Sequence, residues 1–152
     1  MLKKMIFGLM TVCLLILTWS ACSEKKAPQE AEVLDVENML EPKGDTPLEK
    51  MASLMENYVN YLKDKHIKAE ADVKEMESVS EKLQEITDRL GAEAEKWNES
   101  LTEADKDKLT GKMALILTKI DQYAEEAESE AKRLGKEAEE NGLSLDDADS
   151  NP

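Results

Sequence analysis

The stretch TPLEKMASLMENYVNYLKDKHIK, residues 46–68, decides how this chain can fold. Thr46 can cap a helix, Pro47 suits the first helical position, and Glu49 completes a capping box. Apolar side chains then recur three and four residues apart, which predicts an amphipathic helix with a broad buried face. They are residues 48, 51, 55, 58 and 62, widened by Leu54, Val59 and Tyr61. The pattern stops over residues 63–68, although this stretch holds neither proline nor glycine.

Two more helical segments follow. The apolar spacing resumes at Ala69 and continues to Trp97, and residues 98–101 are expected to form a turn. Thr102 and Asp105 form a second, weaker capping box. The apolar positions of the last helix are Leu109, Met113, Ile116, Ile120, Ala124, Ala127, Ala131 and Leu134. Asn141-Gly142 supplies its stop.

The lengths of these segments leave two all-α architectures open. Residues 103–140 span about 57 Å as a helix, whereas an unbroken helix over 47–99 spans about 80 Å. A straight antiparallel hairpin therefore leaves the apolar residues of 48–59 in water. Either the chain bends at 63–68 into a three-helix bundle with coiled-coil-like seams, or the extended hairpin pairs with another chain. The sequence favours the bundle.

The bundle carries an expected register. Folding back at 63–68 places Leu48 and Met51 level with residues 81–84 and 117–120. At that level the last helix widens to Leu115-Ile116-Leu117, and we expect these side chains to touch two neighbouring helices.

The N-terminus has the pattern of an export signal. Lys3 and Lys4 precede an apolar run, residues 5–18, that is shorter than the roughly 20 residues of a membrane span. Small residues follow in the stretch Trp19-Ser20-Ala21-Cys22, which resembles the signals of bacterial lipoproteins. The resemblance implies cleavage between Ala21 and Cys22 and lipid, including palmitate, on Cys22. It also implies a lipid anchor in the bacterial cell envelope, and Ser23 favours the outer membrane, facing the periplasm.

Two other readings of Cys22 stay open: an ordinary secreted protein with one stray cysteine, and an uncleaved N-terminal anchor. Cys13 lies inside the apolar run and leaves with a cleaved signal, so the mature chain holds no disulfide partner for Cys22. The lack of a partner favours lipidation.

The charge of the chain excludes one class of partner. The sequence has 20 basic and 34 acidic residues, and Lys3 and Lys4 leave with the signal, so the mature chain carries 18 against 34, or −16. Binding to nucleic acid requires a basic face, and we expect none here.

The chain divides into four parts. Residues 1–21 are the signal peptide, and 22–45 are the lipidated N-terminus and a flexible tether. Residues 46–141 are the helical bundle, and 142–152 are a disordered acidic tail. A short apolar patch over 33–40 leaves a transient helix or docking motif open as an alternative to a plain linker.

No catalytic, cofactor or metal site is predicted. His66 is the only histidine, and Glu70 lies one helical turn after it. Nothing in the sequence places His66 beside Ser78 or Ser80, as nucleophilic catalysis would require. Asp147 begins a stretch like a calcium loop, but Pro152 stands at the sixth position, where such a loop requires glycine, and no glutamate follows at the twelfth.

We therefore expect a non-enzymatic protein that is anchored to the membrane through Cys22 and acts as an interaction or assembly subunit with an envelope partner. The alternative is a self-associating structural or stress-associated envelope lipoprotein. The stretch WNESLTEADKDKL, residues 97–109, together with the general layout, resembles the small helical lipoproteins of Bacteroidota. That resemblance implies no specific activity.

Overall fold

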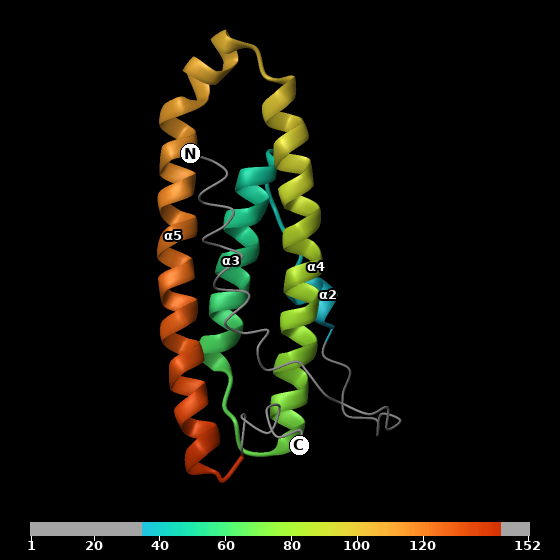
Figure 1. Ribbon diagram of the computed structural model, residues 1–152, viewed down its shortest axis with the longest axis vertical. Coiled ribbons are helices and arrows are strands. Elements are labelled where there is room, and N and C mark those ends of the chain that lie inside the picture. Colours follow the sequence, from blue (N-terminus) through green and yellow to red (C-terminus); the bar gives the residue numbers. More distant parts are fainter. Residues whose placement is uncertain (1–34, 144–152) are drawn as a thin grey trace, which may run out of the picture.

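The computed structural model describes residues 35–143, and this part of the chain is all-α. It holds the short helix α2 (Val36–Met39) and three long helices, α3 (Pro47–Asp64), α4 (Glu70–Ser100) and α5 (Glu103–Glu140). The long helices form one bundle, in which α3 runs down, α4 up and α5 down in the view of Figure 1. The three-helix bundle is confirmed, because the chain leaves the helical conformation between Asp64 and Glu70.

Local capping sets where the helices begin. The Thr46 hydroxyl accepts a hydrogen bond from the Glu49 amide at 3.2 Å, and the Glu49 carboxylate accepts one from the Thr46 amide at 3.1 Å. Thr102 and Asp105 form the same reciprocal pair at the start of α5. At α4 the carboxylate of Asp72 accepts from the amides before the helix. The turn between α4 and α5 is shorter than predicted, because α4 continues to Ser100.

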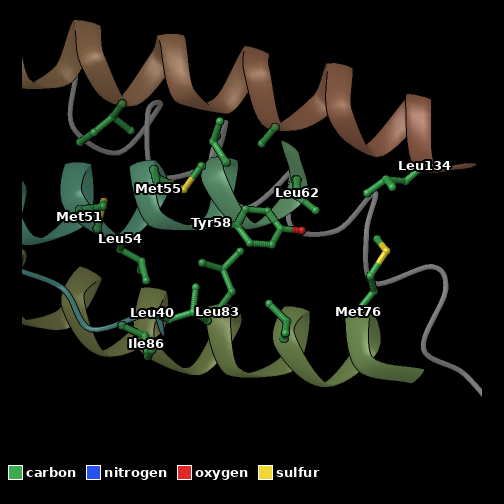
Figure 2. Packing of buried hydrophobic residues seen from close by; sticks show 14 of the residues in the cluster. Leu40, Met51, Leu54, Met55, Tyr58, Leu62, Met76, Leu83, Ile86 and Leu134 are labelled. Atoms are coloured by element: carbon green, nitrogen blue, oxygen red, sulfur yellow. The ribbon is translucent and has the colours of Figure 1, made fainter. Parts of the chain in front are cut away.

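Helix α3 lies between α4 and α5 and packs against both, so its apolar residues form a broad buried face (Figures 1 and 2). Its buried residues are Leu48, Met51, Leu54, Met55, Tyr58, Val59 and Leu62. The two outer helices bury narrower stripes, because each has only one close neighbour along most of its length. Figure 2 shows Tyr58 in the middle of this core.

The predicted register is wrong. Lys50 lies 3.7 Å from Glu93, and Glu49 lies 2.7 Å from Lys112, so the start of α3 is level with residues 93 and 112 rather than with 81–84 and 117–120. The connection after α3 is extended at Lys65 and Ala69. An extended residue rises about 3.3 Å, compared with 1.5 Å in a helix. The connection therefore carries the chain further along the bundle before α4 begins, as Figure 1 shows.

The shift in register changes the surroundings of residues 115–117. Ile116 and Leu117 are partly buried and pack against the core. Leu115 does not touch two neighbouring helices as expected, because its side chain is 70% exposed. With α3 on only one side of α5, the opposite side of α5 has no neighbour within residues 35–143.

The predicted tether does not extend to residue 45. Leu40 is fully buried against the α3–α4 interface, beside Leu83 and Ile86 (Figure 2). The Asn57 amide group donates to the Glu41 carbonyl at 3.1 Å, and the Lys43 amide donates to the Ser53 hydroxyl at 3.2 Å. Within the described residues, the short helix α2 (Val36–Met39) and Leu40 dock on the bundle, as in the alternative to a plain linker. The folded body therefore begins near residue 36.

Candidate functional site

The predicted modification site lies outside the described residues. Ala21 and Cys22, the two sides of the expected cleavage, both precede residue 35, and most of the acidic tail follows residue 143. Lipidation at Cys22 therefore stays a prediction. Among residues 35–143, no helix is both long enough and apolar enough to cross a membrane.

The end of the bundle around the α4–α5 turn consists of two helices instead of three. We call residues 97–109 the tip. Because Lys50, in the first turn of α3, lies level with Glu93, Pro47 is level with about residue 96, and α4 rises about 6 Å beyond it before ending at Ser100. Figure 1 shows both outer helices continuing past the first turn of α3. The tip therefore lacks the central helix that covers α4 and α5 elsewhere.

The apolar positions predicted along α4 and α5 continue into the tip. Trp97, Leu101 and Leu109 are each only half-buried there. On α4, Leu83 and Leu90 lie beside α3 and are almost fully buried. The sequence placed apolar side chains at these tip positions, but only the register of α3 shows that nothing in the described chain fully covers them.

A polar network at the other end of the bundle holds the α3–α4 connection. The Arg133 guanidinium donates to the carbonyls of Leu62 and Lys65, at 2.8 and 3.1 Å. The side-chain amide of Asn141 donates to the Ile67 carbonyl at 2.7 Å. The Leu62 carbonyl is one of those that a helix leaves open at its C-terminal end, and the Lys65 and Ile67 carbonyls lie just after the helix. The Ile67 side chain is buried. No sequence signal links Arg133 and Asn141 to a stretch about 70 residues earlier.

The only histidine belongs to this same network. His66 Nδ1 lies 2.9 Å from a Glu137 carboxylate oxygen, so its partner is a residue of α5 and not the neighbouring Glu70. The hydrogen bond from His66 is the main reason that the pKa of Glu137 lies below its ordinary value. Ser80 is buried on α4 and Ser78 is exposed, and His66 is hydrogen-bonded to neither. The described residues hold no group of three side chains arranged to bind a metal ion.

A shallow groove lies where α2, α3 and α4 meet. Its volume is about 480 Å³, and it is lined by Met39, Asn57, Asn60, Tyr61, Asp64, Lys65 and Glu75. The Tyr61 hydroxyl donates to Glu75 at 3.0 Å, and Lys65 pairs with both Glu75 and Asp72. Burial, and then the nearby Glu75 charge, raise the pKa of Tyr61, so its hydroxyl stays protonated. The polar groups of the groove are used to join helices.

Comparison with known proteins finds no matching family model, no similar curated protein and no similar solved structure. The candidate site therefore rests on the geometry of the chain itself. At the tip, apolar side chains of both α4 and α5 are left without a covering helix.

Proposed function

We propose that this chain is a lipid-anchored protein of the bacterial cell envelope that acts without catalysis, as an interaction or assembly subunit. Cys22 anchors it in the outer membrane, facing the periplasm. Its protein partner binds the tip. The observation that carries the proposal is the half-burial of Trp97 and its apolar neighbours where α3 is absent.

The fold itself indicates what kind of partner fits. Along the rest of the bundle, α3 lies between α4 and α5 and buries the apolar stripes of both. A short amphipathic helix of the partner, laid across the tip in line with α3, covers the tip residues in the same way. Full burial of one such side chain contributes about 1.5–3 kcal/mol, so completing the burial of three half-buried ones gives a few kcal/mol.

The position of the tip suits an anchored protein. Glu37 of α2 pairs with Lys82 at 3.1 Å, so the described chain begins beside the middle of α4. From Lys82 to Ser100 the helix rises about 27 Å. A tether over residues 22–35, as the sequence predicts, has an average reach of about 20 Å. This arrangement leaves the tip well away from the point where the tether joins the body.

Site-specific photo-crosslinking in living cells tests the partner. We place a photoreactive amino acid at Leu109 in the tip of the full-length chain, and at exposed Ser78 on α4 as the matched control. The expected result is one discrete heterologous adduct from position 109 that is absent from position 78. Loss of that adduct in the Cys22→Ala variant links binding to anchoring. Equal adducts from both positions, or none from 109, contradict the proposal.

Metabolic labelling tests the anchor separately. We expect the full-length chain to incorporate labelled palmitate and to fractionate with the outer membrane, and the Cys22→Ala variant to lose both properties. Labelling that persists in this variant contradicts lipidation at Cys22 while leaving the partner question to the crosslinking experiment.

A further inference from the structure

Asn141 caps the C-terminal end of α5 and at the same time holds the α3–α4 connection. Its side-chain amide donates to the Ile67 carbonyl at 2.7 Å and to the Glu137 carbonyl at 2.9 Å. An aspartate cannot make these bonds, because a carboxylate accepts hydrogen bonds and donates none. The connection therefore depends on an amide group at position 141.

The next position favours glycine for a separate reason. The backbone at Gly142 has a φ of +70°, in the left-handed region that other side chains disfavour. This turn closes the helix end, since the Gly142 amide donates to the Glu139 carbonyl and the Leu143 amide donates to the Ala138 carbonyl, both at 3.0 Å. Leu143 then packs against the core. The fold thus requires an asparagine and a glycine side by side.

Asparagine followed by glycine is the pair most prone to deamidation, because glycine has no side chain to shield the attacking backbone nitrogen. The Gly142 nitrogen forms a bond to Cγ of Asn141, the Cγ–Nδ2 bond breaks, and ammonia leaves with the amide proton. Water then opens the cyclic imide at one of its two carbonyl carbons. The product is aspartate or isoaspartate, and either carries one additional negative charge. Of the six asparagines in the chain, only Asn141 precedes glycine.

The closed cap holds Asn141 in a geometry that blocks this reaction. The ψ angle of Asn141 is 8°, so the Gly142 nitrogen lies alongside the backbone nitrogen of Asn141 and away from Cβ and Cγ. Ring closure requires ψ to rotate until the Gly142 nitrogen reaches Cγ, which breaks the hydrogen bond to Glu139. The leaving group, Nδ2, is also held by two carbonyls. The end of α5 therefore has to open before the reaction can proceed.

We propose that Asn141 is a deamidation site that the fold protects, and that its modification irreversibly releases the α3–α4 connection. The product cannot re-form the hydrogen bond to the Ile67 carbonyl. Its new carboxylate lies at the C-terminal end of α5, where negative charge is unfavourable. Isoaspartate also adds a methylene group to the backbone, which displaces Leu143 from the core.

The modification turns a reversible motion into a permanent change. Opening of a helix end is ordinarily reversible and leaves the molecule as it was. Deamidation during such an opening prevents the connection from closing as before, so the modified fraction rises with the age of the chain and with the frequency of opening. This connection lies at the opposite end of the bundle from the tip, so its ageing is independent of the partner proposed there.

Peptide mapping by mass spectrometry tests the site and its protection. The purified full-length chain is aged at neutral pH in native buffer and, in parallel, in guanidinium chloride. We expect Asn141 to deamidate in denaturant, and its rate in native buffer to be at least tenfold lower. Asn57 is the internal control, because its side chain also donates to a carbonyl but Tyr58 follows it. Equal rates at Asn141 in the two conditions, or no preference for Asn141 over Asn57 in denaturant, overturn the proposal.

A matched pair of variants tests whether opening of the connection sets the native rate. Arg133→Met removes the donors to the Leu62 and Lys65 carbonyls and loosens the same connection. It is expected to raise the native deamidation rate at Asn141 at least threefold, whereas Lys132→Met, at an exposed position, leaves the rate unchanged. Equal rates in the two variants overturn the link between this connection and the reaction.

Asn141→Asp reproduces one of the two products and tests the consequence. We expect hydrogen exchange of the amides of residues 65–69 to be at least fivefold faster than in the wild type. Asn60→Asp adds the same charge at an exposed position of α3 and is expected to leave this exchange unchanged. Circular dichroism checks that both variants keep their helices. Exchange in Asn141→Asp as slow as in the wild type overturns the release of the connection.

Discussion

Leu40→Ala measures whether residues 36–45 belong to the folded body. The side chain of Leu40 has no exposed surface and packs in the main core. Replacing a buried leucine by alanine costs about 2–5 kcal/mol, depending on how well the site can collapse. We expect a cost at the low end of this range, because the short segment around Leu40 can relax or detach locally. The stability lost cannot exceed the free energy with which this segment docks on the bundle. We expect the free energy of unfolding to fall by about 2 kcal/mol and Tm by about 10 °C.

Leu115→Ala is the matched control, because it is the same chemical change at a side chain that is 70% exposed. It is expected to change the free energy of unfolding by less than about 0.5 kcal/mol. Urea unfolding followed by far-ultraviolet circular dichroism, at low protein concentration, measures both variants. If Leu40→Ala is as mild as Leu115→Ala, residues 36–45 do not dock and the folded body begins near residue 46.

Three further predictions address the connections between helices. Ile67 lies outside the helices, so Ile67→Pro is expected to leave the helical circular dichroism signal unchanged. Loss of the buried Ile67 side chain lowers the stability of the fold. A large loss of helical signal contradicts the break after α3. Arg133→Met removes the donors to two backbone carbonyls, and we expect the free energy of unfolding in urea to fall by about 1–3 kcal/mol. The control Lys132→Met, at an exposed position, is expected to lower it by less than about 0.5 kcal/mol. Equal losses in the two variants refute the role of Arg133. The pKa of Glu49 is lowered from 4.5 to about 2, first by the hydrogen bond from Lys112 and then by backbone amides. Since the folded pKa is depressed, the stability that Glu49 contributes is present above pH 4.5 and lost as the pH falls toward 2, so the difference between wild type and Glu49→Gln is expected to disappear over that interval.

The sequence determined the features that depend on neighbouring residues. The capping boxes at Thr46 and Thr102 set the starts of α3 and α5, since both partners of each hydrogen bond lie within four residues. The apolar spacing indicated which side of each helix is buried, and its loss over 63–68 indicated the break. These signals are short-range, and together they were enough to predict an all-α bundle.

The tertiary structure alone decided how the helices align. The extended residues after α3 lengthen the connection, and their larger rise per residue moves α4 along α3 by several turns. That register exposes Leu115 and leaves Trp97 half-covered at the tip, although both positions follow patterns that the sequence shows.

The long-range contacts also lay beyond the sequence. Leu40 reaches the core, and Arg133 reaches the carbonyls at the end of α3, only because the fold brings together segments that are distant in the chain. Residue spacing describes the chain within a few turns of each position. Packing decides which of the distant surfaces meet and which remain free to bind, because it acts between helices whose offset no local pattern encodes.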